Sequence, residues 1–162
     1  GISAFGLAAQ LGIGRAEADK YIKSYFERYA GVKRFIDQTV AEVRRTGVTR
    51  TLFGRERPIP DINIRNPAAR SFAERTAVNS PLQGTAADLI KLAMIAIDRA
   101  LTAGGFETRM LLQVHDELLF ESPPGEADRV RGLVKREMEQ VHKLEVPLLV
   151  DVGVGDNWRD AK

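Results

Sequence analysis

The sequence predicts an α+β fold in which helices come first and a small, largely antiparallel sheet packed on helices comes after them. Apolar residues recur at helical spacing in the first third of the chain, in residues 67–103 and in residues 130–141. β-prone segments instead occur as pairs separated by a short turn, at residues 48–58 and 109–121. Because strands and helices alternate without the regularity of βαβ units, antiparallel pairing is expected.

Three helices are expected in the first third of the chain. Ser3 can cap a first helix that ends at Gly12 and Gly14, a second covers residues 15–29, and a third ends at the stop signal Gly47. The second helix carries an aromatic stripe that could stack nucleic-acid bases. At this period a stripe more often faces a core, so we expect core packing. The stripe comprises Tyr21, Tyr25, Phe26 and Tyr29.

A hairpin with arginines at its tip is expected next. Residues 48–52 are β-prone, and residues 53–55 are typical of a turn. Pro58 and Pro60 restrict the segment after this turn to an edge strand or a loop, because proline cannot donate to a strand ladder.

A long, mostly buried helix is expected from Pro67 to about Ala103. Proline is favoured in the first turn of a helix, and apolar residues recur along one face as far as residue 101. Pro81 and Gly84 are expected to bend or interrupt this helix near its middle, because proline removes a backbone donor there.

The last third is expected to contain a second hairpin, a helix and a strand. Residues 109–121 form two apolar segments with His115-Asp116 at the turn between them. An amphipathic helix is expected over residues 130–141, and a final strand over residues 147–154.

The composition is that of one globular domain, or of a piece of one. The chain has 162 residues, 44% of them hydrophobic and 28% charged, which excludes a disordered or collagen-like chain. It has no cysteine, which excludes thiolate chemistry and favours a reducing compartment. Its longest apolar stretch, residues 89–97, is interrupted by Lys91 and is much shorter than a membrane span. The sequence opens on Gly1 rather than Met, so we expect a fragment.

The charges are distributed unevenly along the chain. Residues 28–75 contain eleven Lys and Arg against five Asp and Glu, a net charge of +6, whereas residues 101–162 contain eight against twelve, a net charge of −4. Arginine, the main cation of the first segment, offers a planar fork of donors suited to phosphate oxygens and base edges. Nucleic acid is therefore an expected partner, and solvated helix faces are the equally weighted alternative.

The turn at His115, Asp116 and Glu117 carries the main candidate chemistry. Consecutive strand residues point to opposite faces, so one carboxylate is expected to bind an ion and the other to support it. Hard oxygen ligands suit Mg²⁺ or Mn²⁺. Taken alone, the pattern is weak and favours a solvated acidic turn instead.

Four stretches, in order and spacing, match a known family. They are Gly1-Ile2-Ser3 with Gly6-Leu7-Ala8, then Thr51-Leu52-Phe53-Gly54-Arg55-Glu56-Arg57, then AERTAVNSPLQGTAAD at residues 73–88, and finally Gln113-Val114-His115-Asp116-Glu117. The tail, Gly153-Val154-Gly155-Asp156-Asn157-Trp158, matches as well. Through these stretches, which span nearly the whole chain, the sequence resembles the C-terminal portion of the family-A (bacterial DNA polymerase I-like) DNA polymerases.

The resemblance implies a right-hand polymerase, in which fingers helices deliver the nucleotide and a palm sheet holds two Mg²⁺ ions, for which Mn²⁺ can substitute. Residues 1–47 would be the C-terminal part of the fingers and residues 48–162 that of the palm. Asp116 matches the second metal-binding aspartate, Glu117 the neighbouring acidic residue, and His115 a residue near the primer terminus. The implied reaction is DNA-templated transfer of a deoxynucleotide to a primer 3′-OH by two-metal-ion catalysis, in DNA replication and repair.

The resemblance also implies that the long helix binds DNA. Arg75, Asn79 and Gln83 match residues that lie along the duplex beside the nascent base pair. Purine N3 and pyrimidine O2 acceptors occur there in every correct pair, so donors can check pair geometry without reading sequence. Hydrogen bonds to a neighbouring helix are the alternative role for these side chains.

Three further residues are implied to bind DNA. Arg55 and Arg57 would contact phosphates from the tip of the first hairpin, with solvated charge as the alternative. Ser3 matches a serine near the template strand, and an ordinary helix cap explains it equally well.

Some parts of the family's active site have no match. The first metal-binding aspartate is missing, since Asp61, Asp88 and Asp151 lie in the wrong surroundings. The Arg and Lys that bind the incoming triphosphate have no match either. We therefore expect a fragment that holds half of an active site and is inactive alone.

The implied partners are primer–template DNA and deoxynucleoside triphosphates, bound by a monomer without membrane attachment in the bacterial cytoplasm, beside the nucleoid. A non-catalytic module that binds duplex DNA is the alternative from another class of function. Single-subunit RNA polymerases are the alternative among enzymes, but their turn is typically His-Asp-Ser, so Glu117 favours DNA synthesis.

Overall fold

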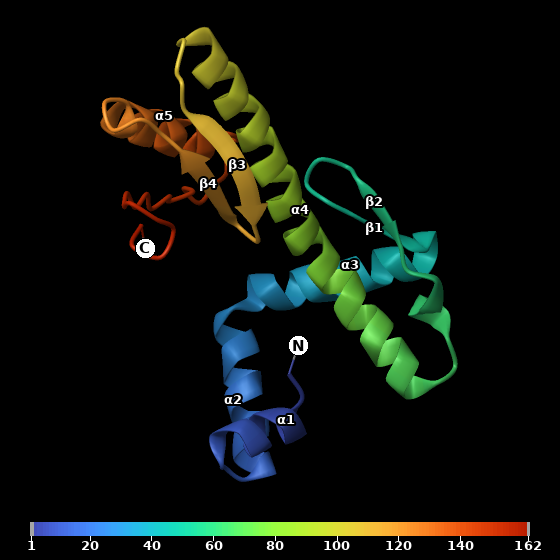
Figure 1. Ribbon diagram of the computed structural model, residues 1–162. Helices are drawn as coiled ribbons and strands as arrows, with labels where there is room; N and C mark the ends of the chain where they lie inside the picture. The colour runs from blue at the N-terminus through green and yellow to red at the C-terminus, as the bar shows by residue number, and fades with distance from the viewer. Residues whose placement is uncertain (1, 162) are drawn as a thin grey trace. The chain divides into compact units, whose positions relative to one another are not determined.

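The computed structural model describes residues 2–161 and shows an α+β chain (Figure 1). The chain forms two compact units, Gly1–Thr85 and Ala86–Lys162, and the boundary falls within one long helix. The predicted fold class is confirmed, although the strands form two separate two-stranded antiparallel sheets. No helix within residues 2–161 is both long and apolar enough to cross a membrane.

Three helices open the first unit, as predicted. They are α1 (Ala4–Leu11), α2 (Arg15–Arg28) and α3 (Ala30–Thr46). Ser3 caps α1 by accepting a hydrogen bond from the Gly6 amide at 3.1 Å. Gly12 and Gly47 end α1 and α3 in the left-handed region, with φ of 67° and 77°, where a residue with a Cβ is disfavoured. Gly1, the first residue of the matched stretches, lies outside the described residues.

The expectation that the aromatic stripe of α2 packs in a core is wrong for its tyrosines. Tyr21, Tyr25 and Tyr29 are 55%, 49% and 50% exposed. The Tyr25 ring contacts that of Tyr29, with centroids 4.9 Å apart. The buried side of α2 is instead formed by the small Ala18. Helical spacing shows which residues share a side of a helix, but it does not show what covers that side.

A short hairpin and a 3₁₀ helix come next, and they pack on α3. Strand β1 (Val48–Arg50) pairs antiparallel with β2 (Glu56–Pro58), and η1 (Pro60–Asn63) comes after β2. Gly54, at φ 80°, allows the turn between the strands. The core of this unit comprises Val43, Ile59, Ile62, Ala73 and Ala77.

Helix α4 (Pro67–Ala103) is continuous, so the predicted interruption at Pro81 is wrong. Asn66 caps the start of α4. Its side-chain oxygen accepts hydrogen bonds from the Ala68 and Ala69 amides at 3.0 and 3.1 Å. Pro81 has no N–H, so the Ala77 oxygen lacks its usual donor one turn ahead. Thr49 of β1 supplies that donor, because its hydroxyl bonds the Ala77 oxygen at 3.1 Å. A contact from another element thus replaces the missing helix hydrogen bond.

The second unit contains the last part of α4, a hairpin and one further helix. Strand β3 (Arg109–Val114) pairs antiparallel with β4 (Glu117–Glu121), with one irregularity between Met110 and Leu112, and α5 (Ala127–Glu139) comes after the hairpin. Both strands and α5 agree with the predicted elements. The core residues are Ile97, Leu101, Val130, Leu133 and Val134, with Phe106, Met110 and Phe120 packed against them.

The strand predicted over residues 147–154 is wrong. These residues form no regular element, and Leu149 is 86% exposed. A strand needs a neighbour to pair its backbone groups, and none of the described strands pairs with this segment. Its backbone is attached instead through the Val150 amide, which donates to the Glu139 carboxylate at 3.1 Å.

Glu126 joins the start of α5 to the segment before β3. Its carboxylate accepts hydrogen bonds from the Thr108 hydroxyl at 2.7 Å and from the Glu107 and Thr108 amides at 3.0 Å. The hydrogen bond from the Thr108 side chain is the main reason that the pKa of Glu126 is lowered, and the Glu107 amide adds to it. Three donors on one carboxylate favour its charged form.

Removal of the Thr49 hydroxyl, which donates to the Ala77 carbonyl, should destabilise the folded chain. Thr49→Val keeps the side-chain volume but leaves a buried carbonyl without a donor, which costs about 1–3 kcal/mol. In a Pro81→Ala background, residue 81 regains an N–H that can reach the Ala77 oxygen, so the same substitution should cost much less. Thermal unfolding of the unchanged chain, the two single variants and the double variant measures both losses. Equal losses in the two backgrounds would contradict the role given to the hydroxyl.

The contribution of Glu126 to stability should depend on pH. Because its pKa is lower in the folded chain than in the unfolded chain, its stabilisation is present above the unfolded pKa and is lost as the pH falls through the folded pKa. Glu126→Gln should therefore lower the melting temperature near pH 7, and the difference in melting temperature between the two proteins should shrink as the pH is lowered below the ordinary pKa of a Glu carboxyl. A difference that stays constant across this range would rule out the charged form as the cause.

Candidate functional site

The turn between β3 and β4 presents His115, Asp116 and Glu117 at one end of the hairpin. Val114 and Glu117 are the last cross-strand pair, so His115 and Asp116 form a two-residue connection. Within residues 2–161, His115 is the one non-glycine residue with positive φ, at 55°. Non-glycine residues adopt this left-handed conformation uncommonly, and it tends to persist where the surrounding structure holds it.

Both carboxylates of this turn are exposed, and neither has a hydrogen bond or an ion pair with another described residue. The Gln113 side chain supports the turn by donating a hydrogen bond to the His115 carbonyl at 2.8 Å. Carboxylate oxygens are the donors that Mg²⁺ and Mn²⁺ prefer. Among the described residues, however, no group of three or more His, Asp or Glu side chains is arranged to hold a metal ion. The turn could bind an ion only together with further ligands.

A second group of predicted residues lies along one side of α4. Arg75, Asn79 and Gln83 are four residues apart, so they follow one stripe along the helix, and all three are exposed whereas Ala73 and Ala77 are buried. The Arg75 guanidinium donates to the Ser71 hydroxyl at 2.8 Å. Asn79 and Gln83 make no side-chain hydrogen bond with any other described residue, so the alternative of bonds to a neighbouring helix has no counterpart here.

Arg55 and Arg57 reach α4 from the β1–β2 hairpin. Arg55 donates to the Gly84 carbonyl at 3.0 Å, and Arg57 donates to the Ser80 hydroxyl at 3.2 Å. Both arginines line a small cleft that Gln83 lines as well. A guanidinium has five N–H donors, so the bond to Ser80 uses only part of the donor capacity of the exposed Arg57 side chain.

The structure therefore places the predicted site residues in two groups. The hairpin arginines adjoin the exposed side of α4 in the first unit, and the acidic turn lies in the second. Ser3 differs from the other predicted residues of the first unit, because its hydroxyl oxygen caps α1. Its O–H can still donate, since the cap uses only an acceptor site.

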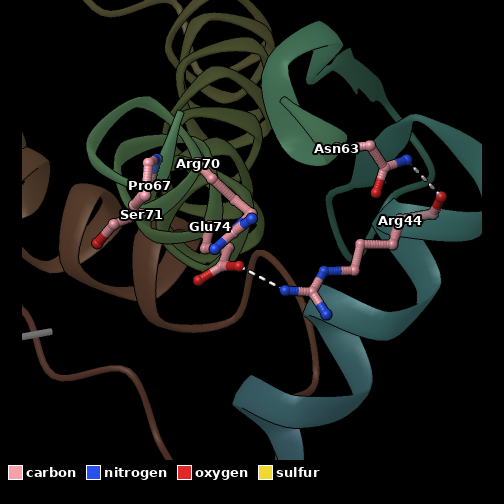
Figure 2. Close-up of a pocket in the computed structure, with 6 residues that line it drawn as sticks. All are labelled: Arg44, Asn63, Pro67, Arg70, Ser71 and Glu74. Atoms are coloured by element: carbon pink, nitrogen blue, oxygen red, sulfur yellow. Dashed lines mark hydrogen bonds and ion pairs between the residues drawn. The ribbon is translucent and has the colours of Figure 1, made fainter. Parts of the chain in front are cut away.

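Sequence reasoning missed a polar cleft between α3, η1 and the start of α4 (Figure 2). Arg44 forms an ion pair with Glu74 at 2.6 Å across this cleft, and the Asn63 side chain donates to the Arg44 carbonyl at 3.1 Å. The remaining lining residues are Pro67, Arg70 and Ser71. Arg44 and Glu74 are 30 positions apart, and no local pattern reveals an ion pair over that separation.

Sequence reasoning also missed the residues that fasten the first hairpin to α4. They are Thr49, Ser80, Gly84 and Thr85. A signal for one of them was present, since a proline within a helical pattern leaves a carbonyl four residues earlier that needs a donor.

Comparison with known proteins identifies the family. The sequence profile of DNA polymerase family A matches residues 1–160. The chain belongs to DNA polymerase family A. This confirms the resemblance found in the sequence, and it accounts for the predicted fold class.

Several family A relatives are similar over the whole chain. DNA polymerase I of Streptococcus pneumoniae is 54% identical over 162 residues, which is 100% of this chain and 18% of the relative. DNA polymerase I of Mycobacterium tuberculosis is 48% identical over 158 residues, covering 98% of this chain and 18% of the relative. The chain thus spans about a fifth of the length of these curated relatives.

A solved family A structure has the same fold. It is the POL domain of Pol1 from M. smegmatis, described as a complex with DNA primer-template and dNTP. Its TM-score is 0.95 at 45% sequence identity, and the match covers 99% of this chain and 28% of that chain.

Proposed function

We propose that this chain is part of the polymerase domain of a DNA-directed DNA polymerase of the polymerase I type. The primer 3′-OH attacks the α-phosphate of a deoxynucleoside triphosphate, which forms a phosphodiester bond and releases pyrophosphate. Residues 1–47 would belong to the fingers and residues 48–162 to the palm. Family membership over residues 1–160 supports this proposal, as does the similarity to a polymerase domain described with primer-template and dNTP.

The observation that carries the proposal is the pair of exposed carboxylates at the β3–β4 turn, which have no partner among the described residues. Asp116 would bind a divalent ion, Mg²⁺ or alternatively Mn²⁺, and Glu117 would support it from the first position of β4. When bound, a pair of such ions stabilises the charge that develops on the attacking and leaving oxygens. His115, beside Asp116, would lie near the primer terminus.

The exposed side of α4 would face the DNA duplex. Asn79 and Gln83 have free amide donors for the purine N3 and pyrimidine O2 acceptors of the minor groove. Arg75, on the same side, would add a charged donor. Because these acceptors have the same positions in all correct base pairs, the contacts would report pair geometry rather than sequence.

Arg55, Arg57 and Ser3 would contact the nucleic-acid backbone. Arg57 uses only part of its donor capacity on α4, and charge-assisted bonds from arginine to phosphate are among the stronger hydrogen bonds of proteins. The Ser3 hydroxyl accepts the capping bond, so its hydrogen would be available to the template strand. Contacts of this kind position the DNA without reading its sequence.

Removal of the Asp116 carboxylate should abolish nucleotide addition. In the complete polymerase that carries this sequence (the parent polymerase), Asp116→Ala should lower the single-turnover rate at least about 100-fold, since an electrostatic contact to the transition state is lost. Primer–template affinity should change by no more than a few fold. The matched control is Glu121→Ala, an exposed carboxylate at the far end of β4, which should keep the normal rate. If Asp116→Ala retains more than about a tenth of the rate, the proposed metal role is wrong.

Gln83→Ala in the parent polymerase should lower discrimination between matched and mismatched primers. The lost donor bonds the terminal pair only when that pair has the correct geometry, so extension of matched primers should slow more than that of mismatched primers, by about two- to tenfold for one hydrogen bond. The ratio of the two extension rates is measured together with thermal unfolding. An unchanged ratio with a lowered melting temperature would leave Gln83 with a structural role alone.

A further inference from the structure

The loop of the β1–β2 hairpin contacts α4 immediately after Gln83. The Thr85 hydroxyl accepts a hydrogen bond from the Leu52 amide at 2.9 Å, and the Gly84 carbonyl accepts one from Arg55 at 3.0 Å. We propose that Thr85 is a positioning residue, which holds this loop on α4 and thereby fixes the direction of the Gln83 side chain toward the minor groove. This proposal rests on the function proposed above for Gln83.

The loop and the helix approach each other so closely that only glycine fits between them. A Cβ at Gly84 would lie 2.6 Å from the Thr51 side-chain methyl, which is closer than carbon atoms pack. Thr51 cannot easily move away, because its amide donates to the Arg55 carbonyl at 3.0 Å and its hydroxyl accepts from the Arg55 amide at 3.2 Å. The loop is therefore a fixed surface against which this turn of α4 is placed.

Helix α4 needs such support in this turn. Pro81, two residues before Gln83, has no N–H and so leaves one helix hydrogen bond unmade. Contacts from the hairpin lie on either side of this missing bond. Thr49 bonds the Ala77 carbonyl before it, and Thr85 bonds the Leu52 amide after it. Without the Thr85 bond, the segment after Pro81 would be attached to the hairpin less firmly, with the Arg55 bond to the Gly84 carbonyl remaining.

No hydrogen bond to another described residue fixes the position of the Gln83 side chain. Its side chain is exposed and makes no hydrogen bond with any described residue. Its direction is therefore set by the helix backbone alone, and the backbone of the next two residues is set by the hairpin loop. A donor that checks base-pair geometry has to be held in place before the DNA arrives, because a mobile donor would bond matched and mismatched pairs alike.

The test compares Thr85→Val with Thr85→Ser in the parent polymerase. Valine keeps the branched shape and removes the acceptor, whereas serine keeps the acceptor. Thr85→Val should lower the ratio of matched to mismatched extension about two- to tenfold, as expected for the loss of one hydrogen bond. Thr85→Ser should stay within about twofold of the unchanged enzyme. An unchanged ratio for Thr85→Val, or an equal loss in both variants, would overturn the proposal.

Testing Thr85→Val in a Gln83→Ala enzyme separates a positioning role of Thr85 from a general effect on stability. If Thr85 acts through Gln83, Thr85→Val should have no further effect on the ratio in a Gln83→Ala enzyme. If Thr85→Val lowers the ratio of matched to mismatched extension equally in both backgrounds, the proposal is overturned and the role of Gln83 stays intact. If Gln83→Ala alone leaves the ratio unchanged, the minor-groove role fails first, and the positioning role is overturned with it.

Gly84→Ala is an independent test of the close contact between the hairpin loop and α4, because this substitution favours the helix itself. Alanine favours a helix interior more than glycine does, but its methyl group would collide with Thr51 and displace the loop. The ratio of matched to mismatched extension should therefore fall about two- to tenfold, as for Thr85→Val. A ratio at the level of the unchanged enzyme would contradict the requirement for close contact.

Discussion

The hydrogen bond from Thr49 to the Ala77 carbonyl is the contact on which the first unit depends. It allows α4 to pass through Pro81 without a break, and it requires the β1–β2 hairpin to lie against the helix at that point. Arg57, Arg55 and Thr85 continue the same attachment toward the C-terminal end of this unit. The hairpin thereby lies against one side of α4, while Arg75, Asn79 and Gln83 stay exposed.

In the second unit, other contacts hold the β3–β4 turn that carries the candidate metal-binding residue. Apolar residues of α4, α5 and the β3–β4 hairpin form its core, and Glu126 fastens the chain before β3 through three hydrogen bonds. The turn at His115 needs no support from its own side chains, so Asp116 is available to an external ligand. The amides of Asn79 and Gln83 and the Asp116 carboxylate thus make no hydrogen bond with another described residue. The other side chains proposed to bind DNA make structural contacts as well, as Ser3, Arg55, Arg57 and Arg75 do.

Local patterns predicted most of the fold, and long-range contacts explain the failures. The caps at Ser3 and Gly47 and the second hairpin follow from neighbouring residues alone. The continuity of α4 could not be predicted, because the donor for Ala77 lies 28 residues earlier. Likewise, the motif around Asp116 pointed to the candidate site, whereas Thr85 was missed because its partner lies 33 residues away. Tyr21 shows that periodicity cannot tell a covered side from an exposed one.

The most direct test of the proposed DNA-binding role is to locate the exposed side of α4 on DNA. A photo-reactive residue at position 83 of the parent polymerase would be irradiated in the presence of primer–template, with the same residue at exposed Asp61 of η1 as the control. Position 83 should crosslink to the base pair at the primer terminus, and position 61 should not. Crosslinking from position 83 that is no stronger than from position 61, or that maps only to single-stranded template, would contradict the proposed role.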